Sequence, residues 1–232
     1  MIAIIAAMAE ELECFLSHIH ILEKEEINGS FIYLAELNKI KILLVKCGIG
    51  KVESASLTTY IICKYQPKYI INTGTFGTLS SKLNLFDLVV ADNLLYHDVD
   101  VTAFGYSYGQ VPQRDLAFKS NKDLVSLAQT IQNVIIGAIL SGDQFISNKE
   151  HISFIQKTHF KEYDVLGVDM ESASIAQVCT NFKIPFIIIR IVSDNLHFKG
   201  EQKDFAIIAQ KCSIISYDFV RQFIERERRN DK

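Results

Sequence analysis

Residues 167–195 read GVDMESASIAQVCTNFKIPFIIIRIVSDN, and this stretch indicates the fold class. After the acidic pair Asp169 and Glu171, the pattern predicts a helix, a turn and the apolar strand 186–192. A helix rises about 1.5 Å per residue and a strand about 3.3 Å, so the helix carries the chain away and the strand brings it back. Glu171 and Asp194 are therefore expected at one edge of a sheet, where α/β proteins bind ligands.

The remaining patterns predict short apolar strands that alternate with amphipathic helices. Strands are expected at 2–7, 31–36, 40–46, 69–71, 87–91 (with an extension to 96) and 134–140, and helices from about 10 and at 51–64, 121–132, 148–158 and 203–226. This alternation predicts an α/β fold with a central mixed β-sheet flanked by helices on both faces. No linker or repeat divides the chain, so a single domain is expected over residues 1–232, with a frayed charged tail from about 225.

Composition excludes several classes of protein. A hydrophobic content of 49% and a charged content of 22% are typical of a globular protein with a sizeable core. The net charge of -3 argues against a nucleic-acid partner. No run approaches the roughly 20 apolar residues that span a membrane, and the N-terminus lacks signal-peptide features. The five cysteines lie far apart without metal-ligand spacing, which indicates reduced thiols in a cytoplasmic protein.

Polar or acidic residues follow four of the predicted strands. They are Glu10 and Glu11, Thr73 and Thr75, Asp169 and Glu171, and Ser193 and Asp194. Each pair alone fits an ordinary cap or turn, because a helix dipole favours carboxylates in the first turn and hydroxyls are common in turns. Their coincidence at the same kind of strand end predicts a shared active site.

These residue types limit the chemistry. The six histidines show no ligand spacing and no cysteine or serine lies in a nucleophile elbow, so no metal, cofactor or covalent nucleophile is expected. Paired acids then suggest general acid–base catalysis on a neutral substrate, such as glycosidic hydrolysis. Arg190, which lies among aliphatic residues, needs a carboxylate partner, and Glu11 and Glu171 are the candidates.

Residues 97–118 have neither helical nor strand periodicity and contain four Phe or Tyr residues. A long loop in a compact domain is usually functional or packed against something. Clustered aromatic residues in such a loop indicate a subunit interface or a lid over a ligand.

Seven motifs occur in order along the chain. They are Met8-x-x-Glu11, GIGK (48–51), NTGT (72–75), YHDVDVTAFGY (96–106), SGDxFI (141–146), MESxxIAxVC (170–179) and PFIIIRxVSD (185–194). With these motifs the chain, from Ile2 to about Lys211, resembles the bacterial 5′-methylthioadenosine/S-adenosylhomocysteine nucleosidases of the purine nucleoside phosphorylase superfamily. The resemblance implies a homodimer that cleaves the N-glycosidic bond of adenine nucleosides and releases adenine and a thioribose, as in methionine salvage.

The resemblance also implies residue roles. Asp194 would protonate adenine N7 with Ser193 orienting it, and Glu11, helped by Arg190, would activate water. The substrate would be bound by Met8, Ile49, Thr75, Gly77, Phe145, Ile146, Asp169, Met170 and Glu171, and the partner's loop, with Val101, Phe104 and Pro112, would cap the alkylthio tail. Protonation of the base requires a raised pKa at Asp194, whereas ionised Glu11 and Glu171 would stabilise an oxocarbenium-like sugar.

Two other functions fit the same fold. A phosphate-dependent nucleoside phosphorylase would need arginines where this chain has Glu11 and Asn72, and a non-catalytic nucleoside-binding protein would not need the intact acids. Several residues depart from the family pattern: Asp169 replaces Glu, Phe76 and Thr78 replace small residues, and Phe198 or Phe205 would have to supply the lid aromatic. They bear on the preference among methylthioadenosine, adenosylhomocysteine, deoxyadenosine and aminodeoxyfutalosine more than on the reaction type.

Overall fold

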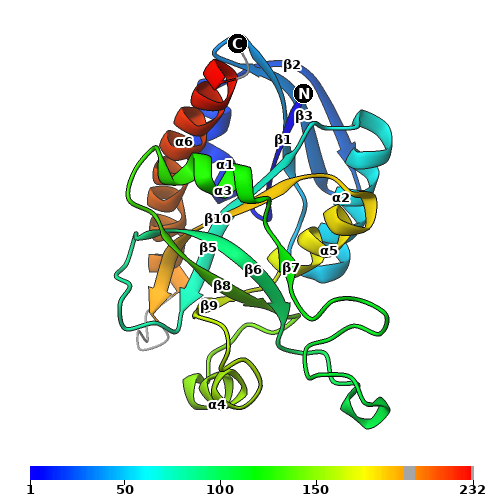
Figure 1. The fold of residues 1–232 in the computed structure, drawn as a ribbon. Helices are drawn as coiled ribbons and strands as arrows, with labels where there is room; N and C mark the ends of the chain where they lie inside the picture. The colour runs from blue at the N-terminus through cyan, green and yellow to red at the C-terminus, as the bar shows by residue number, and fades with distance from the viewer. Residues whose placement is uncertain (196–201, 231–232) are drawn as a thin grey trace.

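The computed structural model describes residues 1–195 and 202–230, which form one mixed sheet with helices on both faces (Figure 1). The strands are β1 Ile2–Ala6, β2 His20–Ile27, β3 Ser30–Leu37, β4 Ile40–Lys46, β5 Ile70–Thr78, β6 Leu88–Tyr96, β7 Phe118–Lys119, β8 Ile135–Ser141, β9 Val165–Asp169 and β10 Phe186–Asn195. The helices are α1 Ala9–His18, α2 Lys51–Tyr65, α3 Lys122–Gln129, α4 Lys149–His159, α5 Ser172–Phe182 and α6 Gln202–Asn230, with a short 3₁₀ turn η1 at Thr102–Phe104. Within the described ranges, no helix has the length and apolar character needed to cross a membrane.

Five of the strands close into a ring. The sheet order is β10-β6-β8-β9-β5-β1-β4-β3-β2, and β10 also pairs with β5. β10 runs parallel to β5, whereas β9 pairs antiparallel with the end of β5. β1 pairs with the first part of β5, on the same edge as β9, and β4, β3 and β2 continue the sheet from β1. The ring therefore brings strands of opposite direction to the carboxyl end of β5.

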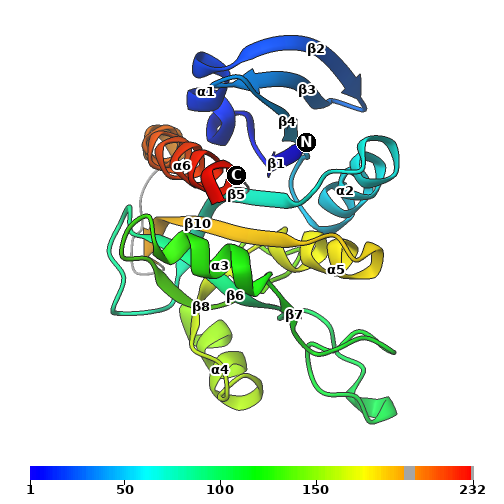
Figure 2. The same cartoon turned by 45° about the horizontal axis from the view of Figure 1, so that its top comes forward.

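Apolar side chains form a core on each face of the sheet. On one face, α2 and α5 contribute residues such as Leu57, Ile61 and Ile175 to a buried cluster with β1, β4 and β5. On the other face, α1, α3 and α6 pack against the sheet, with Phe15 and Phe223 fully buried. Figure 2 shows α6 and α3 on one side of the sheet and α2 and α5 on the other. The observed layers confirm the predicted α/β fold class.

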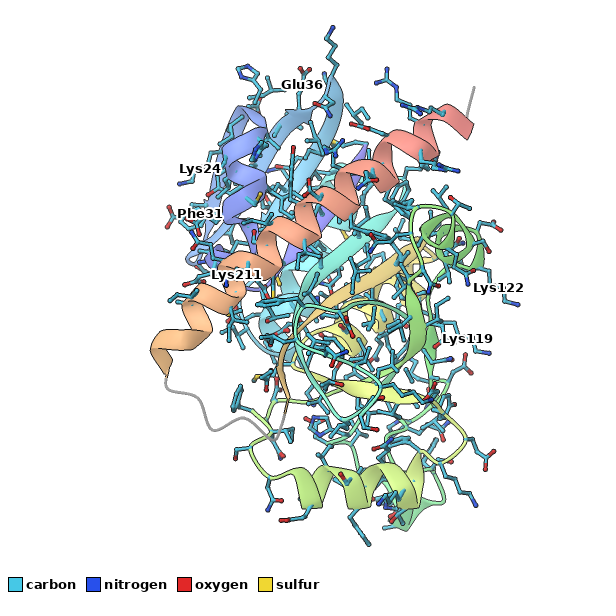
Figure 3. All side chains as sticks on the ribbon, turned by 90° about the vertical axis from the view of Figure 1, so that its left-hand side faces the viewer. Lys24, Phe31, Glu36, Lys119, Lys122 and Lys211 are labelled. Carbon is cyan, nitrogen blue, oxygen red and sulfur yellow. The ribbon has the colours of Figure 1, made fainter. Side chains whose placement is uncertain are left out.

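The sheet ends in an exposed edge strand, β2. Its sequence, HILEKEEI, is largely exposed along its whole length, so it has no buried face and no hydrophobic alternation. This explains why the sequence pattern did not predict it. Lys24 on β2 places Nζ 4.1 Å from the ring centroid of Phe31 on β3, and the two lie side by side in Figure 3. Charged residues on an edge strand hinder pairing with another chain.

Other differences from the predicted elements concern the site. The segment 72–78, expected to leave the sheet as a turn or loop, continues β5 because β10 and β9 pair with it on either side. The short buried strand β9 was not predicted. Helix α6 continues to Asn230 instead of ending near 226.

Candidate active site

One cavity lies where β1, β5, β9 and β10 end. It is lined by Ala7, Met8, Glu11, Ile49, Thr75, Phe76, Gly77, Gln144, Phe145, Ile146, Val168, Asp169, Met170, Glu171, Ser193 and Asp194. The lining includes every residue predicted to act in catalysis or substrate binding except Arg190, which is buried beneath it. Ala7, Gln144 and Val168 were not predicted, although Gln144 and Val168 adjoin residues that were.

The strand register explains how the acids meet. Gly77 of β5 lies opposite Asp194 of β10 on one side and opposite Val168 of β9 on the other. β9 and β10 run in opposite directions, so a flat sheet would hold their carboxyl ends apart. Ring closure brings these two carboxyl ends together. Glu171 and Asp194 therefore converge as predicted, but because the ring closes, which the sequence pattern does not indicate.

Two residues of the predicted pairs lie outside the cavity. Glu10 is exposed on α1. The hydroxyl of Thr73 lies 2.5 Å from that of Ser216 on α6, deeper under the helices that cover this face of the sheet. In a strand, residues two apart share a face, so Thr73 and Thr75 both face α1 and α6. Thr75, nearer the carboxyl end of β5, is the one that reaches Glu11.

Glu11 is held by four hydrogen-bond donors. Oε2 accepts bonds from the backbone N–H groups of Ala7 and Met8, each at 3.1 Å. Oε1 accepts bonds from the backbone N–H of Thr75 at 2.8 Å and from its hydroxyl at 3.0 Å. Glu11 therefore both caps the start of α1 and ties that helix to β5. These contacts use the four acceptor positions of a carboxylate.

Asp194 lies beside Ser193 and Gly77. The Ser193 hydroxyl donates to Asp194 Oδ1 at 2.8 Å. A Cβ on Gly77 would approach Asp194 Oδ2 to 3.1 Å, so glycine leaves the room that this carboxyl occupies. Burial raises the pKa of Asp194, and the bond from Ser193 partly opposes that rise. The direction of the shift agrees with the prediction for a group that must deliver a proton.

Glu171 faces the start of α2. The backbone N–H of Gly50 donates to its Oε1 at 3.0 Å. Burial, with a smaller contribution from the negative charge of Asp169, raises the pKa of Glu171 to about 8. Burial therefore works against the ionised form that the sequence analysis expects for Glu171, and its charge state with substrate bound stays a prediction. The sequence identifies the acid but not the low polarity of the surroundings that favours its protonated form.

Arg190 pairs with Asp169, and the predicted partners Glu11 and Glu171 are not its ion-pair partners. Arg190 Nη2 and Nε both lie 2.9 Å from Asp169 Oδ2, and Nη2 also donates to Asn72 Oδ1 at 2.8 Å. Glu11 is occupied by the four donors and Glu171 points toward Gly50, which leaves Asp169 to balance the buried guanidinium.

Asp169 is the centre of a buried network. Besides Arg190, it accepts hydrogen bonds from the hydroxyls of Ser141, at 2.5 Å, and Ser172. Arg190 Nη1 nevertheless comes near Glu11, because a Cβ on Gly74 would lie 3.0 Å from Nη1 and 2.7 Å from Glu11 Oε1. Asp169 thus holds Arg190 in an orientation that directs Nη1 toward the catalytic side of the cavity.

Phe76 and Thr78, the two unusual residues of the TGTFGT segment, lie in different surroundings. Phe76 lines the cavity but is buried, with its ring against Gly167, where a Cβ would lie 2.6 Å from a ring carbon. The Thr78 hydroxyl donates to the backbone oxygen of Leu166 at 2.9 Å and does not face the cavity. The side chains of Phe198 and Phe205, the candidates for the lid aromatic, lie outside the described residues.

The predicted partner loop does not contribute to the cavity of its own chain. The segment 97–118 extends away from the sheet in both ribbon views (Figures 1 and 2). Phe104 is 80% exposed, Pro112 is exposed, and Val101 is partly buried. Phe145, at the mouth of the cavity, is also 75% exposed. Large apolar side chains in such positions are typical of an interface.

Comparison with known proteins finds close relatives. Residues 1–225 match the family described as the phosphorylase superfamily. The chain is 36% identical over 231 residues to the 5′-methylthioadenosine/S-adenosylhomocysteine nucleosidase of Staphylococcus aureus strain MRSA252, covering 97% of this chain and 100% of that protein. The Streptococcus pneumoniae MTA/SAH nucleosidase in complex with 8-aminoadenine has a TM-score of 0.89 at 36% identity, covering 97% of this chain and 99% of that one. A Helicobacter pylori nucleosidase of this kind, with one aspartate changed to asparagine and 5′-methylthioadenosine in its active site, has a TM-score of 0.87 at 30% identity, covering 97% of each chain.

Proposed function

This chain belongs to the 5′-methylthioadenosine/S-adenosylhomocysteine nucleosidases of the phosphorylase superfamily, and we propose that Asp194 and Glu11 are the acid and the base of its reaction. It is an N-glycosyl hydrolase that cleaves 5′-methylthioadenosine and S-adenosylhomocysteine and releases adenine, a reaction of methionine salvage. The observation that carries the assignment of roles is the convergence of Glu11, Glu171 and Asp194 in one cavity.

Asp194 protonates the leaving base. Adenine is a poor leaving group as an anion, so proton transfer to N7 in the transition state lowers the barrier, typically by a factor of about 10²–10⁴. A carboxyl can give up a proton near neutrality only if its pKa lies above the ordinary value for aspartate. Burial raises the pKa of Asp194 in that direction, and the hydrogen bond from Ser193 holds one of its oxygens in place.

Glu11 accepts the proton of the attacking water. Its four acceptor positions are filled, so one contact must be exchanged when the water binds. Three of the donors are backbone amides, whereas the Thr75 hydroxyl is on a rotatable side chain. We assign that hydroxyl as the exchangeable contact, which turns toward the substrate when water takes its place. Arg190 Nη1, on the same side of Gly74, helps to hold the water.

The rest of the lining binds the nucleoside. Glu171 contacts the ribose hydroxyls, and in its protonated form it can donate one hydrogen bond and accept another. Met170 packs against the sugar. Phe145 stacks on adenine and the backbone of Ile146 contacts its edge, while Met8, Ile49 and the Thr75–Gly77 segment border the sugar. Asp169 also lines the cavity, and its ion pair orients Arg190, which lies outside the lining.

A phosphorylase is the alternative, and the surroundings of Asn72 argue against it. Asn72 is buried, accepts from Arg190 and donates through Nδ2 to the backbone oxygen of Ile5 at 2.9 Å, so it is committed to the protein. Glu11 would repel a phosphate at the remaining position. Neither residue offers the positive charge that holds phosphate.

Purified protein with 5′-methylthioadenosine tests the reaction type. We expect adenine to appear at the same rate with and without inorganic phosphate, together with free methylthioribose, as followed by chromatography. A phosphate requirement with formation of a sugar phosphate would replace the hydrolase by the phosphorylase. Tight nucleoside binding without adenine release would indicate a non-catalytic binding protein instead.

We also propose that the enzyme is a homodimer in which the 97–118 segment of one protomer caps the alkylthio tail in the cavity of the other. Exposed Phe104 supports this, because burial of an aromatic ring against an apolar thioether is favourable relative to its exposure to water. A cytoplasmic location is supported by the five cysteines, all of which are free thiols.

Replacement of Phe104 by alanine tests the dimer proposal. The side chain is 80% exposed in its own protomer, so the melting temperature should stay nearly constant. KM for 5′-methylthioadenosine should rise about tenfold, the factor that corresponds to loss of one partly buried aromatic contact. Phe154→Ala, at a 64% exposed phenylalanine on α4, is the matched control. A molecular mass near the 26.3 kDa of one chain in sedimentation, or an unchanged KM in Phe104→Ala, would contradict the proposal.

A further inference from the structure

Lys51 occupies a position that helix electrostatics does not explain. It is the first residue of α2, where the helix dipole favours acids and disfavours a lysine. The side chain is only 25% exposed, and its Nζ donates to Asp98 Oδ2 at 2.7 Å. The Asp98 side chain is 12% exposed. A residue that breaks a local rule at the border of an active site is a candidate for a functional role.

Lys51 joins two further segments at the mouth of the cavity. Its backbone N–H donates to Asp143 Oδ1 at 2.7 Å, and its Nζ lies 4.0 Å from Asp143 Oδ2. The Asp143 N–H donates in turn to Asp98 Oδ2 at 2.9 Å. Three segments that are distant in sequence therefore meet at one ammonium group: the start of α2, the exit of β6 and the exit of β8.

Each of these segments leads directly to the substrate site. Gly50, which precedes Lys51, donates its N–H to Glu171. Asp143 precedes Gln144, Phe145 and Ile146, which line the cavity. Asp98 is the second residue of the 97–118 segment, which is proposed to reach the partner protomer. The start of α2 thus binds two carboxylates, those of Glu171 and Asp143, and Lys51 holds the second of them.

We propose that Lys51 is a positioning residue for substrate binding, an inference that rests on the proposed function. Its ammonium group lies between the carboxylates of Asp98 and Asp143 and neutralises their mutual repulsion. Without it, two like charges would face each other at short range, and Asp143 would move away from the start of α2. Gly50 and the 144–146 segment would then lose their placement against the substrate. Asp194 and Glu11 are anchored on β10, α1 and β5, so the chemical step on bound substrate is independent of Lys51.

Lys51→Met is the first test. We expect KM for 5′-methylthioadenosine to rise about tenfold, the factor for one charge-assisted hydrogen bond, while kcat changes by less than about threefold. Adenine binding measured by calorimetry should weaken by a similar factor. Lys64→Met is the matched control, since Lys64 pairs with Glu25 at 2.8 Å at the other end of α2, about 20 Å from Lys51.

Lys51→Met combined with Asp98→Asn separates positioning from a general loss of stability. The second change removes one of the two facing charges, so KM should return toward the wild-type value although another native contact is lost. An additive further rise of KM would overturn the proposal, as would a KM for Lys51→Met equal to that of Lys64→Met. A wild-type protein that releases no adenine would instead refute the proposed function, and calorimetric adenine binding would still decide the role of Lys51.

Discussion

Replacement of Asp194 by asparagine is expected to abolish adenine release, with a fall in kcat of at least about 10²–10⁴-fold. Asparagine has nearly the same shape and can still accept the hydrogen bond that Ser193 donates to Oδ1. It has no acidic proton, so the base can leave only as an anion. The dissociation constant for 5′-methylthioadenosine should change little. Chromatography of adenine and calorimetry of the nucleoside measure the two quantities separately.

The pH dependence of the rate and of the stability gives a second comparison between the wild type and Asp194→Asn. A general acid acts in its protonated form, so the wild-type rate should decline as the pH rises through the raised pKa of Asp194. Because the pKa of this carboxyl is higher in the folded than in the unfolded state, its contribution to stability is present below the unfolded pKa and is lost as pH rises through the folded value. Asp194→Asn should therefore lose less stability than the wild type over that range, as measured by thermal unfolding.

The control for Asp194→Asn is Asp123→Asn, which makes the same chemical change at an exposed aspartate on α3. This control should keep the wild-type rate. If Asp194→Asn turned over within about tenfold of the wild type, Asp194 could not be the general acid. A variant that failed to bind the nucleoside would show a structural role of Asp194 and would equally exclude the assignment.

Glu11→Gln is expected to have the second largest effect, a fall in kcat of about 10²–10³-fold. Glutamine cannot take the proton of the water, and its amide N–H₂ replaces one of the two oxygens, so it cannot accept either the bonds from Ala7 and Met8 or those from Thr75. An unpaired buried donor costs about 1–3 kcal/mol, so a decrease of that size in the free energy of unfolding should accompany the loss of rate. Urea unfolding measures it.

Glu10→Gln is the neighbouring control for this prediction. Glu10 lies in the same first turn of α1 but is exposed, so both the rate and the stability should remain close to those of the wild type. Calorimetric binding of adenine to Glu11→Gln establishes that the cavity is intact. A stable Glu11→Gln protein with a wild-type rate would leave Glu11 with only its role at the start of α1 and would require a different base.

Local patterns in the chain were sufficient for most of the fold. The continuous apolar runs at β1, β4 and β8 and the amphipathic spacing of α1 and α2 are each encoded by neighbouring residues, so their positions were predicted to within a residue or two. β2 escaped prediction because it buries neither face. The second half of β5 escaped because glycine and threonine in NTGTFGT are typical of a turn. Its strand conformation comes from β9 and β10, which pair with it from distant parts of the chain.

Most residues that line the candidate site were also predicted from sequence, because an ordered series of motifs specifies residue types and the order in which they occur. Their pairing was not. Arg190 was expected to pair with Glu11 or Glu171, and it pairs with Asp169. Asp169 was expected to contact substrate; it lines the cavity, and it also accepts hydrogen bonds from Ser141, Ser172 and Arg190, which the sequence pattern did not predict. The partner of Arg190 depends on which carboxylate still has free acceptor positions once backbone N–H groups have bound to the others. A local sequence pattern does not contain that information.

The sequence by itself determined the α/β class and the identity of the acids, because periodicity and motif order are properties of adjacent residues. The tertiary structure decided how those acids differ. Ring closure through β9 and β10 brought strand ends of opposite direction to Gly77. Burial raised the pKa of both Asp194 and Glu171, and the four donors around Glu11 fixed its orientation. Desolvation and hydrogen bonding depend on distances through space, and these exist only once the chain has folded.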